Sequence, residues 1–297
     1  GLRRFYQGVL IRHDMTRRVA YGTVIRLATM TGTAAILALT TNVEGAEVGA
    51  AALTAGVSAE AVAAWWMARS PVRSLLADGA DATGAATSYA GLTRFYYPLA
   101  LTTMLSLGIQ PVITFFVGNS RMAIESLAVL PVVSALVFIF RSLGLAYQEV
   151  VIALMGENEQ GFEALRRFGL TLAAAVVVGL GCIAWTPLAM IWFEKVSGLS
   201  PELAAFAILP TRIMAPIVGL TALLSFQRAV LVARDTTNGI TWATIIEVVG
   251  VIAVLWVAIS VFDLVGAVAA AAALLIGRTG ANLYLAPALR PVLPPRS

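Results

Sequence analysis

The sequence has few of the residues that build disulfides, metal centres and catalytic sites. Its 297 residues include one cysteine, Cys182, and one histidine, His13. One cysteine excludes a disulfide within the chain, and these two residues are too few for a cysteine/histidine zinc site of about four ligands. We find no nucleophile with a base, no phosphate-binding glycine loop and no catalytic carboxylate pair. We therefore expect a protein that is not an enzyme and that holds no metal or cofactor.

Charged residues are also scarce, at 12% of the chain, about half the share of a typical soluble domain. The net charge of +4 would favour nucleic-acid binding in a soluble protein, but in a membrane protein it is typical of arginine-rich loops. We therefore expect no nucleic-acid partner.

Long apolar runs dominate instead, with 59% hydrophobic residues and a mean hydropathy of +0.87. Crossing a bilayer takes roughly 20 apolar residues in a helix but only about ten alternating residues in a barrel strand. Eight runs have helical length, and residues 1–12 look like the end of another helix; the runs are 19–41, 48–67, 95–117, 124–155, 168–191, 203–233, 240–261 and 264–286. The sequence predicts an all-α polytopic membrane protein.

Alternating the loops between two sides separates the positive charges. One side carries Arg12, Arg17, Arg18, Arg69, Arg73, Arg94, Arg166, Arg167, Arg234, Arg290 and Arg296. The other side carries only Arg121 and Lys195. Arginine concentrates in cytoplasmic loops, so we expect a multi-pass protein of the cell membrane with the arginine-rich loops and the C-terminus in the cytoplasm.

The predicted spans fall into two lobes related by an internal repeat. We expect residues 1–68 to end an N-terminal lobe, 69–94 to form a cytoplasmic linker, 95–288 to form a C-terminal lobe of six helices and 289–297 to form a cytoplasmic tail. A shift of 221 residues lays Asp14 on Asp235 and Tyr21 on Trp242. Six spans separate the copies, so the repeats are parallel, with a pseudo-two-fold axis along the membrane normal. The first copy lacks four spans that precede the second, which predicts about four helices ahead of Gly1.

Charged residues inside the predicted spans are costly and are usually paired or functional. They are Arg26, Glu60, Arg141, Glu149, Arg212, Glu247 and Arg278. Arg26 and Glu60 lie at matching depths in one hairpin, and Glu247 and Arg278 do so in the equivalent hairpin with the signs exchanged. We predict two structural ion pairs, Arg26–Glu60 and Glu247–Arg278, with snorkelling to the interface as the alternative.

Arg141 and Arg212 have no evident partner. A guanidinium offers a permanent charge and a planar fork of donors for carboxylate or phosphate, so these two, with Gln110 and Glu149, form a candidate site for an anionic substrate. The alternative is structural: Arg141 and Glu149, eight residues apart on one helix face, compensate each other, and Arg212 binds carbonyls freed near Pro210 and Pro216.

Several short segments resemble the progressive ankylosis (ANK) transporter family, within the MATE-like multidrug/oligosaccharidyl-lipid/polysaccharide exporter superfamily. They are Phe95-Tyr96-Tyr97-Pro98-Leu99-Ala100-Leu101 with Pro111-Val112-Ile113, residues 125–130, Pro210-Thr211-Arg212-Ile213 and the Arg/Gln pattern of residues 3–7. The resemblance implies twelve helices in two six-helix lobes, alternating access, and export of anions such as pyrophosphate, ATP or citrate. Arg212 is the one charged position of that family's pattern that we assign to this sequence. Glu247 departs from the pattern, because the family leads us to expect a basic residue there.

Our leading hypothesis is a secondary transporter that exports an organic or phosphorylated anion through a central cavity. Its expected partners are a small anionic substrate, the lipid bilayer and a coupling ion, H⁺ or Na⁺. One alternative is a lipid-linked oligosaccharide flippase, which would also need arginines for a pyrophosphate group. Another is a MATE-type drug or cation antiporter, which would place acidic residues at the midplane.

Overall fold

The computed structural model describes residues 2–12, 15–41, 44–78, 104, 107–155, 161–234 and 238–289, and all regular elements within these ranges are helices. Seven of these helices are long and apolar enough to cross a membrane. This confirms the prediction of an all-α, multi-pass membrane protein. The remaining predicted run, 95–117, is described only in its second part, where Leu107–Gly118 forms a shorter apolar helix.

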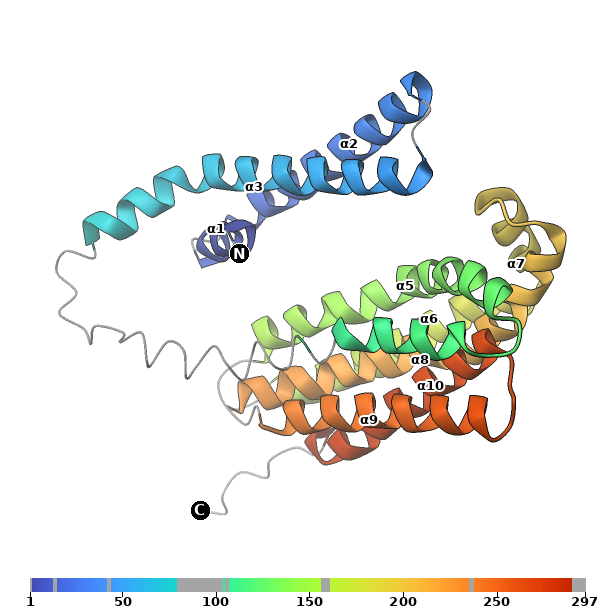
Figure 1. The fold of residues 1–297 in the computed structure, drawn as a ribbon. Helices are drawn as coiled ribbons and strands as arrows, with labels where there is room; N and C mark the ends of the chain where they lie inside the picture. Colours follow the sequence, from blue (N-terminus) through green and yellow to red (C-terminus); the bar gives the residue numbers. More distant parts are fainter. Residues whose placement is uncertain are drawn as a thin grey trace, which may run out of the picture. The chain divides into compact units, whose positions relative to one another are not determined.

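The chain divides into two compact units, Gly1–Ser88 and Tyr89–Ser297. Unit 1 consists of α1 (Leu2–Arg12), α2 (Thr16–Thr40) and α3 (Gly45–Asp78). Helices α2 and α3 form an antiparallel hairpin, and α1 packs against both (Figure 1). Few residues of the two spans are buried within the unit, so most of their apolar surface is free to contact lipid or other protein.

Helix α3 is longer than the apolar run that predicted it. The expected linker was to start at residue 69, but α3 continues through Pro71 to Asp78. Proline removes one backbone donor and leaves the carbonyl four residues earlier without its helical partner. Here that carbonyl belongs to Met67, and Arg18 Nη1 donates a hydrogen bond to it at 2.9 Å. This side-chain bond gives the Met67 carbonyl a partner where the backbone offers none, and α3 continues past the proline. The rest of the expected linker, 79–94, lies outside the described residues.

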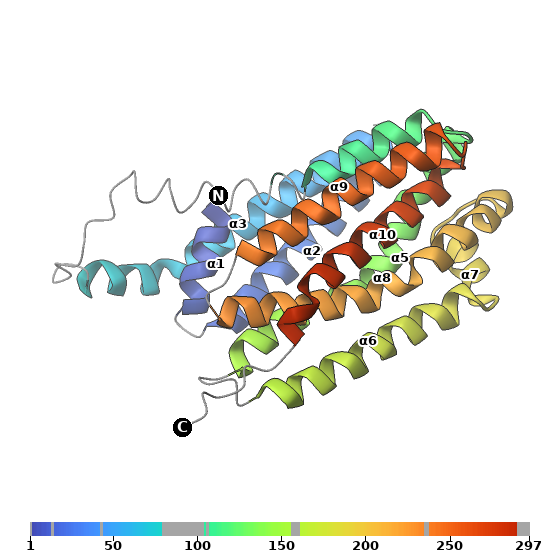
Figure 2. The ribbon, with the colours of Figure 1, turned by 90° about the horizontal axis from the view of Figure 1, so that it is seen from below.

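Unit 2 contains the helix Leu107–Gly118 and five long helices: α5 (Ala123–Leu154), α6 (Phe162–Ala184), α8 (Pro201–Ala233), α9 (Asn238–Ser260) and α10 (Gly266–Leu285). A short α7 (Leu188–Met190) and a π-helix, Ile191–Val196, connect α6 to α8. Helix α8 is central, since it packs against α5, α6 and α10. Figure 2 shows α10 between α8 and α9, with α6 on the other side of α8.

Small residues let these helices approach closely, as is common in membrane bundles. A Cβ at Gly144 of α5 would lie 2.9 Å from the backbone nitrogen of Ala222 in α8. The apolar core beside this crossing includes Val137, Leu136 and Val218, all almost fully buried. Helices α5 and α8 therefore form a close-packed support for the side chains they carry.

The bounds of α6 differ from those predicted from its apolar run, 168–191. It begins at Phe162 and ends at Ala184. At its start, Glu163 pairs with Arg166 at 3.0 Å and with Arg167 at 3.1 Å, and such pairs, three and four residues apart, stabilise a helical turn. A polar but helix-favouring turn precedes the apolar run, and hydropathy alone does not detect it.

Candidate functional site

The site begins with an ion pair between two neighbouring helices of unit 2. Arg278 Nη2 of α10 lies 2.8 Å from Glu247 Oε1 of α9, and the side chains are only 13% and 8% exposed. Gly277 makes this approach possible, because a Cβ there would lie 2.8 Å from the Glu247 carbonyl oxygen. The predicted contact between Glu247 and Arg278 is therefore present, and it is largely buried.

Two further arginines join the pair around one cavity of about 220 Å³. Arg141 comes from α5 and Arg228 from α8. The full lining is Ile109, Gln110, Arg141, Leu145, Arg228, Thr244, Glu247, Leu274 and Arg278. Every described long helix of unit 2 except α6 contributes to it, as does the helix Leu107–Gly118. We call Arg141, Arg228, Glu247 and Arg278 the arginine cluster.

The cluster carries more positive charge than it can neutralise with its own side chains. Its three guanidinium groups face one carboxylate, so the lining of this cavity has an excess of two positive charges. The Nε atoms of Arg141, Arg228 and Arg278 are buried and have no hydrogen-bond partner in the described structure. Arg228 Nη2 makes one weak bond, to Thr244 Oγ1 at 3.4 Å. Donors and charge therefore remain available for an anion.

The ion pair of the cluster, Glu247 and Arg278, lies within the apolar spans rather than at their ends. Glu247 is nine residues beyond the start of α9 and Arg278 is seven residues before the end of α10. At 1.5 Å per residue these positions are roughly 10 to 14 Å along their helices. Isolated charges at such depth are disfavoured and commonly mark a substrate or ion pathway.

A second cavity adjoins the first. It measures about 280 Å³, and the two share Gln110 and Leu274 as lining residues. Thr114 and Ser134 add hydroxyl groups to an otherwise mostly apolar wall. Pro131 also lines it, from within α5. The two cavities are neighbours beside the helix Leu107–Gly118, and the arginine cluster lines one of them.

Arg228 is the member of the cluster that hydropathy analysis missed. It lies only five residues before the end of α8 at Ala233, where an arginine can be taken for one that snorkels to the interface. The internal repeat places Arg228 at the position that corresponds to Gln7, and Glu247 at the position that corresponds to Arg26, under the shift of 221 residues.

Unit 1 contains a related arrangement. Glu60 of α3 accepts a hydrogen bond from Gln7 Nε2 at 3.0 Å and lies 3.5 Å from Arg26 Nη1. A Cβ at Gly56 of α3 would lie 3.0 Å from the Arg26 carbonyl oxygen, much as Gly277 approaches the Glu247 carbonyl. The predicted Arg26–Glu60 contact is present. Gln7, Arg26 and Glu60 come from the three consecutive helices α1, α2 and α3. The two aspartates that mark the repeat, Asp14 and Asp235, lie outside the described residues.

Arg212 occupies a different environment from Arg141. Its Nε donates to the Ala184 carbonyl oxygen at 2.9 Å, at the last residue of α6, and its Cζ lies 5.9 Å from the centre of the Trp185 ring. The last carbonyls of a helix lack backbone partners, and a cation there also complements the helix dipole. Arg212 thus has a structural partner, and it lines neither of the two cavities above. Its role in binding a substrate stays a prediction.

Glu149 is exposed, and in the described part of the chain no ion pair joins it to Arg141.

Among the described residues no three histidine, cysteine, aspartate or glutamate side chains gather in a geometry that could hold a metal ion. Comparisons with protein-family models, curated proteins and solved structures return no significant match.

Proposed function

We propose that this chain belongs to a secondary membrane transporter that exports an organic or phosphorylated anion, and that the arginine cluster binds the cargo. One observation carries the proposal: three arginines and one glutamate line a single cavity within the membrane-spanning helices. Gln110 and Thr244 add neutral hydrogen-bonding groups to the same wall.

An anionic cargo follows from charge and from hydrogen bonding. The lining holds two positive charges that no carboxylate of the cavity balances. The planar fork of an arginine suits carboxylate and phosphate oxygens, and bonds between charged partners are roughly twice as strong as neutral ones. Arg141 is the best placed of the three, because Arg278 pairs with Glu247 and Arg228 bonds Thr244.

Transport, rather than a purely structural role, is favoured by the adjoining cavity. A structural strut needs only the Glu247–Arg278 pair. The additional arginines and the polar groups of the second cavity, Gln110, Thr114 and Ser134, give two neighbouring cavities within the helix bundle more polar lining than a strut requires. We infer alternating access between two lobes of MATE-like fold, with parallel repeats and with the arginine-rich helix ends in the cytoplasm. The similar triads Gln7–Arg26–Glu60 and Arg228–Glu247–Arg278, together with the resemblance to the ANK family, support this inference.

A lipid-linked oligosaccharide flippase is the second candidate, since a pyrophosphate linkage would suit the same arginines. A drug or cation antiporter fits less well, because Glu247 is the one acidic residue lining this cavity and it is paired. H⁺ or Na⁺ remains our proposal for the coupling ion.

Export can be tested with the complete protein in inside-out vesicles supplied with citrate, ATP or pyrophosphate. Arg141→Gln should weaken apparent cargo affinity by about tenfold to a hundredfold, because a bond to a charged group contributes about 1.5 to 3 kcal/mol. Arg141→Lys should restore part of it, since the ammonium keeps the charge but lacks the fork. Arg166→Gln is the matched control, because Arg166 pairs with Glu163 outside the cavity. Unchanged anion uptake by Arg141→Gln would remove the cluster from the transport pathway.

A further inference from the structure

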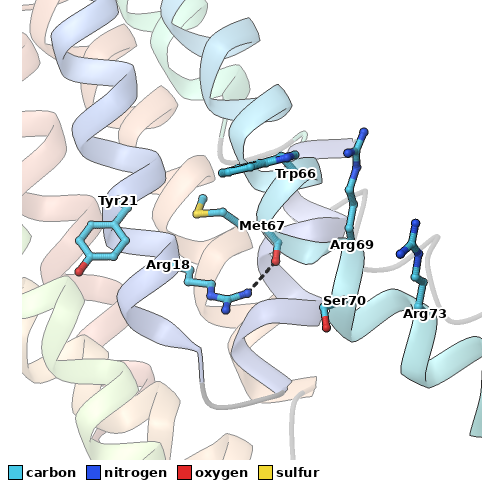
Figure 3. A pocket seen from close by; sticks show the side chains of 7 residues that line it. All are labelled: Arg18, Tyr21, Trp66, Met67, Arg69, Ser70 and Arg73. Atoms are coloured by element: carbon cyan, nitrogen blue, oxygen red, sulfur yellow. Dashed lines mark hydrogen bonds between the residues drawn. The ribbon is translucent and has the colours of Figure 1, made fainter.

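A separate group of arginines surrounds a pocket of about 520 Å³ within unit 1. Figure 3 shows its lining, which is Arg18, Tyr21, Trp66, Met67, Arg69, Ser70 and Arg73. The lining contains three arginines and no acidic residue. The pocket lies where α2 begins and the span of α3 ends, because the two apolar spans cover Arg17–Thr40 and Gly45–Arg73. It is therefore at the membrane surface, at the arginine-rich end of the hairpin.

Arg18 is held in place by the helix irregularity at Pro71. Its Nη1 donates to the Met67 carbonyl oxygen at 2.9 Å (Figure 3), the acceptor that Pro71 leaves without a backbone partner. A guanidinium has five N–H donors, so this bond fixes the side chain while leaving other donors for a ligand. A fixed cation loses less conformational entropy on binding than a freely moving one.

Arg69 and Arg73 provide two more cations one helical turn apart on α3. Both are exposed, and in the described part of the chain neither forms an ion pair. Arg69 instead packs over the ring of Trp65, with its Cζ 3.8 Å from the ring centre. The pocket thus presents unneutralised guanidinium groups at a helix end.

The aromatic and apolar part of the lining distinguishes a lipid from a soluble anion. Tyr21 and Trp66 are 60% and 68% exposed, and such residues concentrate at the membrane interface. Val24 and Leu27, three and six residues beyond Tyr21 on α2, are also exposed apolar side chains. A ligand here meets positive charge at one end and hydrocarbon-compatible surface at the other.

We propose that this pocket binds the phosphate headgroup of an anionic phospholipid in the adjacent leaflet. Arg18, Arg69 and Arg73 bind the phosphate, and Tyr21, Trp66 and Met67 contact the glycerol and the upper acyl chains. The site is independent of the arginine cluster of unit 2 and is a lipid site rather than a cargo site.

Native mass spectrometry of the complete, delipidated protein in detergent tests the site. The probes are dioctanoyl phosphatidylglycerol, dioctanoyl phosphatidylcholine and glycerol 3-phosphate. The protein should prefer phosphatidylglycerol, and Arg69→Gln with Arg73→Gln should lower its apparent affinity about 30-fold, from about 1 kcal/mol for each arginine at an anionic surface and tenfold for each 1.4 kcal/mol.

The matched control is Arg166→Gln with Arg167→Gln, which removes the same charge from a pair of arginines bonded to Glu163 in unit 2; it should retain the lipid preference. If the glutamine variant fails to fold, Arg69→Lys with Arg73→Lys keeps the charge and should lose only part of the affinity. Equal losses in the two glutamine variants would overturn the proposal. Displacement of the lipid by glycerol 3-phosphate at similar concentration would also overturn it, in favour of a soluble phosphate site.

Discussion

Removing the one acidic side chain of the arginine cluster should destabilise the protein more than removing the arginine that pairs with it. In Glu247→Gln, three guanidinium groups lining the same small cavity lose their only carboxylate. Because the Glu247–Arg278 pair is largely buried, breaking it by loss of one partner should cost about 3 to 5 kcal/mol. Repulsion with Arg141 and Arg228 adds to that cost.

Arg278→Gln has a different consequence. The Glu247 carboxylate then remains beside Arg141 and Arg228, which line the same cavity, and either can move to compensate it. We therefore expect a smaller loss, about 1 to 3 kcal/mol, the range for a buried polar group left poorly satisfied. The double variant Glu247→Gln with Arg278→Gln should be more stable than Glu247→Gln alone.

The assay is the temperature at which half of the detergent-solubilised protein leaves the monodisperse peak in size-exclusion chromatography. Expected stability falls in the order wild type, Arg278→Gln, double variant and Glu247→Gln. If Arg278→Gln is the least stable of the four, or if the two single variants lose equally, then Arg141 and Arg228 do not act on Glu247 and the reasoning is wrong.

Three further changes test other parts of the structure. Gly277→Val should force α9 and α10 apart and lower thermal stability by about 1 to 3 kcal/mol, as overpacking does; an unchanged melting temperature would contradict the close helix approach. Arg18→Ala should destabilise α3 by about 1 to 2 kcal/mol. The loss should be smaller in a Pro71→Ala background, because the substituted residue provides a backbone N–H for the Met67 carbonyl. Equal losses in both backgrounds would show that the Arg18 bond does not compensate the proline. Arg212→Gln should lower stability by about 1 kcal/mol, because it removes the cation that binds the C-terminal end of α6. Unchanged stability together with impaired anion transport would instead support a role for Arg212 in binding the cargo.

The spans could be predicted because hydropathy depends on local composition alone. The Arg26–Glu60 and Glu247–Arg278 contacts could also be anticipated, since helix rise converts sequence position into depth and opposite charges at equal depth on adjacent helices are drawn together. Local composition misjudged the start of α6, where Glu163 supports a polar helical turn.

The composition of the site depended on packing that a single sequence does not express. The sequence did not single out Arg228, because its place in the cluster follows from the position of α8 at the centre of unit 2, where its side chain lines one cavity with residues of α9 and α10. Arg212 looked unpartnered because its acceptor is a backbone carbonyl of α6, and every residue type carries such a group. The linker expected to start at residue 69 was placed too early, because α3 continues through Pro71 and the donor that binds the Met67 carbonyl, Arg18, lies on another helix.

Cargo binding by the arginine cluster is tested most directly by a second variant in the same cavity, at Arg228, which lines it together with Arg141. The measurement is uptake of labelled citrate, ATP and pyrophosphate by inside-out vesicles containing the complete wild-type protein, Arg228→Gln or the control Arg167→Gln, at matched protein abundance. We predict that Arg228→Gln lowers uptake of one of these anions about tenfold or more while Arg167→Gln transports as wild type. Wild-type uptake that Arg228→Gln leaves unchanged for every transported anion would contradict the account.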